Sequence, residues 1–213
     1  LEQYIATLPA NAAAKTAAPA TNPAVEPAKG NGTTTFTTPM QTPQSWIFVA
    51  LSGTEDYTPA NRTIMSIASQ ILSNRLLKKV REEMGATYSI GAYGQLERLN
   101  ATNAFIQAPF PVKPEVKDEV IEVVNGKFRE MAEIVTDEEL NPIKEYMLKN
   151  ATESLEKNES WTNAIAGSLI NGVDTFNGAA DVINAITTTD IQNFMRNLLE
   201  QGNYRVMVLD PAE

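Results

Sequence analysis

The sequence contains no histidine and no cysteine among its 213 residues. Serine and cysteine hydrolases of the common types need a histidine base, and most zinc sites need histidine or cysteine ligands. We therefore expect no complete machinery of either kind, and no disulfide framework, on this chain. The carboxylate pairs Glu82-Glu83 and Glu138-Glu139 lie on helical patterns, where a solvated helix face is favoured over acid–base chemistry.

Basic residues and long apolar runs are also scarce. Lys and Arg number 17 against 26 Asp and Glu, which gives a formal net charge of −9. Without a basic stripe, nucleic acids and anionic membrane surfaces are poor partners. No apolar run reaches the roughly 18–20 residues that a membrane-spanning helix needs. The hydrophobic content of 43% nevertheless suffices for the packed core of one domain.

Alanine, proline, threonine and asparagine dominate the sequence from residue 10 to residue 35. Three prolines and two glycines within this stretch interrupt any helix, and little in it can be buried. We predict a flexible linker over residues 10–35, preceded by the end of a helix at residues 1–9. A folded domain is expected over residues 36–213, with regular structure resuming near Phe36. Because the chain begins with leucine, we interpret it as a piece of a longer protein.

Apolar periodicity predicts an α+β domain with one mixed sheet and helices packed on one face. Ser45 to Leu51 is almost continuously apolar, which is typical of a fully buried strand. Thr87 to Gln95 and Ala101 to Phe110 are expected to form an antiparallel pair that ends at Pro111. Tyr204 to Leu209 is expected to be the last strand.

The helical segments are marked by their start signals. The expected helix starts are Thr58, Ser73, Thr136 in a capping box with Glu139, Ser160, and Thr187 with Asp190. The apolar spacing slips at Ser73-Asn74, so we predict a kink or short break there. The apolar helix stripes are interpreted as core rather than as cofactor contacts.

The segment from Arg81 to Ser89 joins a helical pattern to a strand pattern. Gly85 lies at the change, where a helix end most often needs a residue that tolerates positive φ. This places Arg81 in the last helical turn and Tyr88 near the start of a strand, so that both side chains reach the same space at a sheet edge. Physical chemistry alone favours an ordinary interpretation, with Arg81 as a cation on the helix dipole and Tyr88 as a strand tyrosine.

The same segment resembles the second half of pitrilysin- and insulinase-type zinc peptidases, which include mitochondrial processing peptidase and small bacterial two-domain proteases. The resemblance rests on Leu72-Ser73-Asn74-Arg75-Leu76, then Val80-Arg81-Glu82-Glu83, Gly85 and Tyr88-Ser89. It extends to Leu1–Pro9, Asp137-Glu138-Glu139-Leu140, Trp161 and Tyr204–Pro211. Nearly the whole chain is covered, except about residues 11–35.

The resemblance implies a LuxS/MPP-like metallohydrolase fold and the substrate-binding half of a zinc-dependent metalloendopeptidase that is inactive alone. Zinc would lie outside this chain, on an N-terminal domain of the same protein or a partner subunit, and a peptide would be the substrate. Tyr88 would act as the catalytic hydroxyl donor, and Arg81 together with Tyr88 would bind substrate. The alternative is a non-catalytic scaffold or partner-subunit domain of the same fold. A bacterial cell envelope or periplasmic location is implied only at family level.

Overall fold

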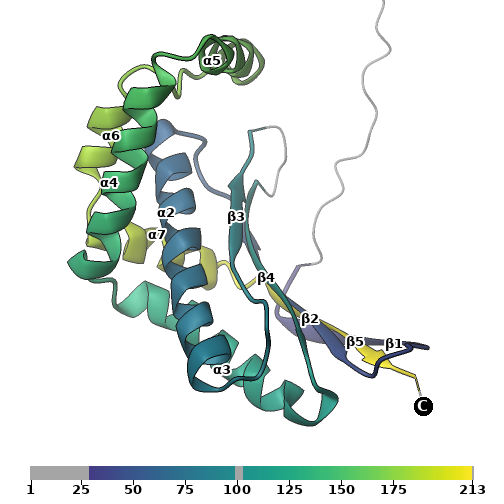
Figure 1. Ribbon diagram of the computed structural model, residues 1–213. Coiled ribbons are helices and arrows are strands. Elements are labelled where there is room, and N and C mark those ends of the chain that lie inside the picture. Colours follow the sequence, from purple (N-terminus) through teal and green to yellow (C-terminus); the bar gives the residue numbers. More distant parts are fainter. Residues whose placement is uncertain (1–28, 99–102, 213) are drawn as a thin grey trace, which may run out of the picture.

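A single five-stranded sheet with helices on one side forms the domain in the computed structural model, which describes residues 29–98 and 103–212 (Figure 1). The strand order is β1-β5-β2-β4-β3. Only β1 and β5 pair in parallel, and the other neighbours are antiparallel. The predicted α+β architecture, with a mixed and mainly antiparallel sheet, is confirmed.

The strands are β1 (Gly32–Thr38), β2 (Ser45–Gly53), β3 (Tyr93–Leu96), β4 (Ala104–Val112) and β5 (Tyr204–Pro211). The helices are α2 (Pro59–Leu76), the π-helix η2 (Leu77–Glu83), the 3-10 turn η3 (Pro114–Val116), α3 (Lys117–Glu133), α4 (Asp137–Ser154), α5 (Asn158–Asn171), α6 (Ala179–Ala185) and α7 (Thr188–Glu200). The core lies between the sheet and the layer of α2, α3 and α7.

Strand β2 alternates between buried and open positions, so the prediction of a fully buried strand is wrong. Ile47 and Val49 are fully buried, whereas Trp46 and Phe48 are 38% and 37% exposed. The described helices cover one face of the sheet, and every second residue of a strand points to the other face. The second face therefore keeps aromatic side chains at the surface, including Phe36 of β1.

Strand β1 begins at Gly32, earlier than the expected return of structure near Phe36. The last residues of the expected linker therefore belong to the sheet, where Thr33 pairs with Val206 of β5. Threonine suits a pleated strand even where no apolar residue marks it, which explains the missed start. The expected helix end at 1–9 and the linker up to residue 28 lie outside the described residues.

Helix α2 continues to Leu76 without the break predicted at Ser73-Asn74. The irregularity comes one turn later, in the π-helix η2. There the Met84 amide donates to the Lys79 carbonyl at 3.1 Å, which is an i→i+5 bond. The wider turn keeps Val80 fully buried. The shift in the apolar spacing is therefore accommodated by a wider helical turn and not by a kink.

Strand β4 runs through Pro109 and Pro111 to Val112, two residues beyond the predicted end. Beyond Gln107 no described strand lies on this edge of β4, because β3 pairs with residues 104–107 only. Proline is tolerated in a strand where the missing N–H would face an open edge. The predicted start of this strand, at residues 101–102, lies outside the described residues.

Two of the predicted helix starts carry capping boxes. The Thr136 and Thr187 side chains accept bonds from the backbone three residues on, and Glu139 and Asp190 reciprocate. The Ser160 prediction is wrong: α5 begins earlier, with Lys157 at the N-cap and no side-chain cap. Sequence position alone did not separate a capping serine from one inside the first turn.

Candidate functional site

The helix end before the candidate site is fixed from the buried side. Val80 is fully buried, and its carbonyl accepts from the Ala86 amide at 3.0 Å. The loop between them closes through Gly85, whose φ is +60°, as the sequence predicted. An L side chain adopts this left-handed conformation only at a cost. Arg81 therefore projects from a helix terminus whose direction is set by the core.

Tyr88 does not lie in a strand, contrary to the prediction. Residues 84–92 are irregular, and β3 begins only at Tyr93. Strand β4 pairs with residues 93–96, so the chain before Tyr93 has no ladder partner in the described part of the structure. Thr87 turns the backbone locally, with its hydroxyl donating to the Ser89 carbonyl at 3.3 Å.

The backbone on both sides of Tyr88 is nevertheless anchored. Thr87 is 8% exposed and Ile90 is 5% exposed, whereas Tyr88 is 85% exposed. Two buried neighbours hold the segment on the core and force the phenol outward. The structure thus presents the tyrosine on a short fixed span.

Arg81 and Tyr88 lie together, as the sequence predicted. The Arg81 guanidinium carbon is 5.2 Å from the centre of the Tyr88 ring, within the range of a cation–π contact. Neither the Arg81 guanidinium nor the Tyr88 hydroxyl hydrogen-bonds to any residue in the described ranges. Both polar groups are therefore open to an incoming ligand, with the phenol as a neutral donor next to a fixed cation.

Arg75, in the last turn of α2, has a structural role instead. Its Nε and Nη2 donate to the two carboxylate oxygens of Glu139 at 2.6 and 2.7 Å, and Nη2 also donates to the Ile134 carbonyl at 2.8 Å. The hydrogen bond from Arg75 lowers the pKa of Glu139, against the opposing effect of burial. The bidentate pair ties α2 to the start of α4.

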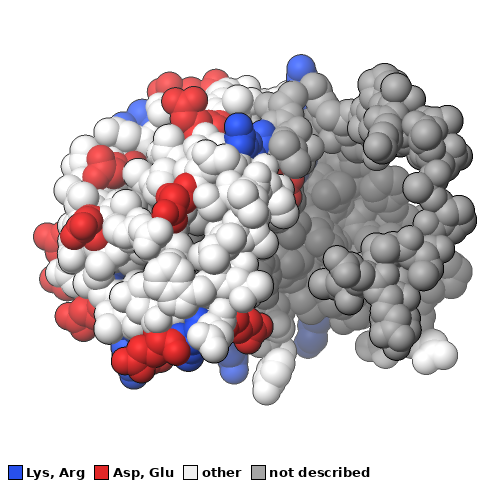
Figure 2. Space-filling view, turned by 90° about the horizontal axis from the view of Figure 1, so that it is seen from above, with Lys and Arg blue, Asp and Glu red and all other residues white. Residues whose placement is uncertain are grey.

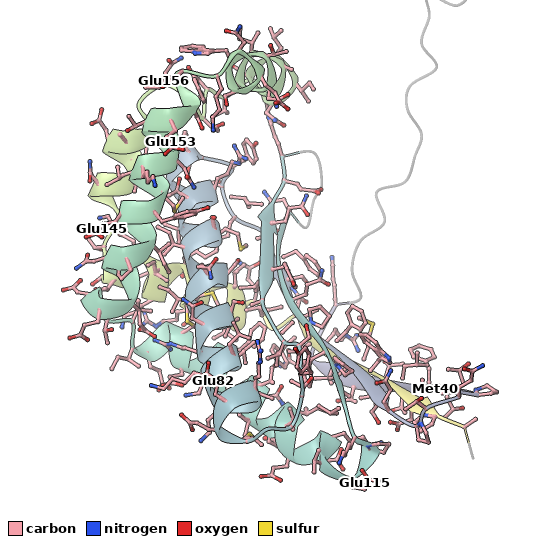
Figure 3. The ribbon with its side chains drawn as sticks, in the orientation of Figure 1. Met40, Glu82, Glu115, Glu145, Glu153 and Glu156 are labelled. Atoms are coloured by element: carbon pink, nitrogen blue, oxygen red, sulfur yellow. The ribbon has the colours of Figure 1, made fainter. Side chains whose placement is uncertain are left out.

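The pair Glu82-Glu83 lies on a solvated face, as the sequence predicted, whereas Glu139 of the second pair is half-buried and does not. Glu82 is exposed at η2, where Figure 3 labels it, and Glu83 pairs with Lys79 at 2.8 Å. Glu138 is exposed, and Glu139 is the partner of Arg75. Neither pair brings two carboxylates to one reacting position.

Strand β3 provides a further exposed aromatic residue that sequence reasoning missed. Tyr93 is 62% exposed and opens the edge strand. Behind it, Gly94 lets the strand lie directly on α2, because a Cβ there would come within 2.0 Å of Ser69 Oγ. The signal available in the sequence was Gly94 within a strand pattern, because a glycine inside a strand often marks a close approach of another element.

The residues that the structure describes do not form a zinc site. The sequence has no histidine or cysteine, and within the described ranges no three acidic side chains gather closely enough to hold a metal. The available donors are carboxylates, amides and hydroxyls, which zinc rarely uses alone. For the same ranges, no helix combines the length and apolar content needed to cross a bilayer.

Comparison with known proteins identifies a peptidase context. The sequence model described as "Peptidase M16 inactive domain" matches residues 1–147. No curated protein sequence matches the chain significantly.

Solved structures share the fold at low sequence identity. The periplasmic protease PqqL from Escherichia coli superposes with a TM-score of 0.77 and 18% identity, covering 87% of this chain and 21% of that protein. The ferredoxin protease FusC, solved with Arabidopsis ferredoxin, superposes with a TM-score of 0.75 and 17% identity, again covering 87% of this chain and 21% of that protein. A chain of complex III2 from Candida albicans superposes with a TM-score of 0.63 and 14% identity, covering 84% of this chain and 45% of that one. The chain thus spans about a fifth of the two proteases.

Proposed function

Because the chain belongs to the peptidase M16 inactive-domain family, we propose that it is the substrate-binding half of a zinc-dependent metalloendopeptidase. In this proposal it closes over a peptide that is bound at a zinc site on a separate N-terminal domain, and it is inactive alone. The observation that carries the proposal is the pair of Arg81 and Tyr88. Both are exposed at an anchored helix end, in contact with each other, and uncommitted to other described residues.

The chemistry assigned to Tyr88 is hydrogen-bond donation. When a peptide carbonyl is attacked, negative charge develops on its oxygen, and a donor already aimed at that position stabilises it without reorganisation. A phenol suits this role because it is neutral at pH 7 and still a donor. The proton stays on the Tyr88 oxygen throughout, and no bond to the protein forms.

Arg81 is assigned to positioning. Its guanidinium lies over the face of the Tyr88 ring, 5.2 Å from the ring centre. Its N–H groups, which bond to none of the described residues, can donate to a backbone carbonyl of the substrate. The charge also favours developing negative charge nearby. Restricting the ring in this way lowers the entropy cost of reaching a productive geometry.

A peptide can also use the sheet edge. Strand β3 is the last strand on its side of the sheet, so one row of its backbone groups has no strand partner in the described structure. An extended peptide pairs with such an edge by main-chain hydrogen bonds. This would bring a substrate alongside the segment that holds Tyr88.

A non-catalytic scaffold of the same fold is the second candidate. The fold likeness to a complex III2 chain supports it. The peptidase proposal gives a role to the contact between the exposed Tyr88 phenol and the Arg81 guanidinium, which a scaffold does not require, so this contact supports the peptidase proposal. The sequence of the full-length protein distinguishes the peptidase from the scaffold, since the peptidase proposal requires a His-x-x-Glu-His zinc motif outside this chain.

The proposal is tested with Tyr88→Phe in the full-length protein. Loss of one oxyanion donor is expected to lower kcat by about 10²–10³-fold, with the melting temperature unchanged because the hydroxyl has no described partner. Unchanged specific activity in a fully folded variant would remove the catalytic assignment and leave the scaffold.

A further inference from the structure

Helix α5 carries its large apolar side chains outward. Ile165, Leu169 and Ile170 are 58%, 81% and 68% exposed, and no residue of α5 is buried. The half-buried positions of α5 are instead small or polar: Ser160, Ala164, Gly167, Ser168 and Asn171. A surface helix ordinarily buries its apolar stripe and exposes polar residues. The reversed order in α5 indicates a surface built for contact rather than for water.

Charge is nearly absent from this helix. Glu159 is the single charged residue among the 14 of α5, in a chain whose net charge is −9. Figure 1 places α5 at one end of the molecule, and Figure 2 looks onto that end, where uncharged atoms make up most of the described surface. Interface cores are depleted in charge in the same way. The partner surface should therefore be uncharged and apolar.

One anchor of this surface is held rigidly. Trp161 Nε1 donates to the Leu155 carbonyl at 2.9 Å, and the Trp161 ring packs edge-on against Phe176 at 4.8 Å. With Ile165 and Leu169 it forms an i, i+4, i+8 row, which we call the apolar stripe of α5. Fixed aromatic anchors bind with little loss of side-chain entropy.

The size of the stripe indicates what covers it. A 14-residue helix is about 21 Å long, so one of its faces supplies a few hundred Å² at most. Contacts between domains of one polypeptide bury about 600–1,500 Å² in total. Stable complexes of separate proteins, including two copies of this chain, need about 1,200–2,000 Å². A small patch is sufficient when the partner is tethered, because tethering supplies a high effective concentration.

Resting on the proposed function, we propose that the apolar stripe of α5 docks this domain onto the zinc-bearing half of the same protease. The contact is an uncharged apolar groove on that half. Most of the length of PqqL and FusC lies outside the part that matches this chain, which leaves ample polypeptide to provide the groove. η2, which carries Arg81, lies at the opposite end of the helical layer from α5 (Figure 1). The docking surface and the substrate-binding pair therefore do not compete for space.

Site-specific photo-crosslinking in the full-length protease tests the docking. The variant Leu169→p-benzoylphenylalanine is irradiated, and its adducts are mapped by mass spectrometry. The expected result is an intramolecular adduct within the zinc-bearing half. The matched control is Asn163→p-benzoylphenylalanine, on an exposed position of α5 nearly opposite Ile165, which should give none. Adducts to a second copy, to another domain or to an added peptide substrate would overturn the proposal, as would the absence of an adduct.

A pair of charge variants adds a second readout. Leu169→Asp should increase hydrogen exchange of the α5 amides in the full-length protease by about tenfold or more, because a buried charge costs at least the 1.4 kcal/mol that a factor of ten represents. Asn163→Asp adds the same charge outside the stripe and should leave exchange unchanged. Equal exchange in both variants would contradict docking. Neither readout uses catalysis, so an adduct alongside an active Tyr88→Phe enzyme would reject the proposed function while retaining the docking surface.

Discussion

The Arg81 guanidinium carbon lies 5.2 Å from the centre of the Tyr88 ring, although the ring belongs to an irregular segment beyond the helix. Gly85 makes this possible by turning the chain back through a left-handed conformation. The contact couples the position of the phenol to a helix end that Val80 fixes in the core. Tyr88 is thus exposed to solvent, and its ring is held in place by the contact with Arg81.

Removing the cation should weaken substrate cleavage without weakening the fold. Arg81→Ala in the full-length protease is expected to lower kcat/KM about tenfold, since an exposed cation–π contact contributes about 0.5–1 kcal/mol and a misplaced donor costs more. Arg62→Ala is the matched control, because Arg62 lies 5.6 Å from the Tyr57 ring in the same kind of contact. Equal losses of kcat/KM in both variants would show that Arg81 has no special role.

Two tyrosines offer a direct comparison of an exposed and a buried hydroxyl. The Tyr204 hydroxyl bonds to Asn125 Oδ1 at 2.5 Å, and burial raises the Tyr204 pKa. Tyr204→Phe should cost about 1–2 kcal/mol of unfolding free energy by leaving Asn125 without its partner, or several degrees in melting temperature. Tyr88→Phe should cost almost nothing. Thermal unfolding of both variants measures this, and a marked loss in Tyr88→Phe would indicate a structural rather than a substrate-facing hydroxyl.

The sequence predicted those features that depend on local chemistry. The left-handed Gly85, the Thr136–Glu139 capping box and the helix start at Thr187 follow from what individual residues can do, and the structure contains them. The break at Ser73-Asn74 was wrong because a shift in apolar spacing has two physical solutions, a kink or a wider helical turn. Choosing between them requires knowing that Val80 must return to the core.

Features set by the environment were not predictable in the same way. Trp46 and Phe48 read as core residues because composition cannot tell which sheet face helices cover. The strand expected at Tyr88 is absent because β3 pairs with β4 only from Tyr93 opposite Gln107 onward, although β4 itself continues to Val112. The residues of a strand do not show where its pairing with a neighbour stops. The proximity of Arg81 to Tyr88 was predicted, but through the wrong local structure.

Gly85 should be sensitive to substitution through its backbone alone. Its φ is +60°, and no atom lies within 4 Å of where a Cβ would stand. Gly85→Ala should therefore cost about 1–2 kcal/mol from the left-handed conformation, and Gly85→Asn less, because asparagine adopts that region more readily. Gly126→Ala is the control: Gly126 is also open to a Cβ but lies inside α3, where alanine should stabilise by up to about 1 kcal/mol. Chemical denaturation measures the free energy of unfolding of each variant. The same change in Gly85→Ala and Gly126→Ala would contradict the conformational argument.

The Arg75–Glu139 pair predicts a defined loss of stability in acid. Hydrogen bonding from Arg75 lowers the pKa of Glu139 below its ordinary value of 4.5. A carboxylate whose folded pKa is depressed stabilises the fold above its unfolded pKa, and this contribution disappears as pH falls through the folded pKa. Glu139→Gln should therefore lower the melting temperature at pH 7 and flatten its decline below about pH 4.5 relative to the parent chain. Glu138→Gln, one position earlier and exposed, should change neither. Parallel acid profiles for the parent chain and Glu139→Gln would mean that the pair contributes nothing to stability, despite its 2.6 Å contact.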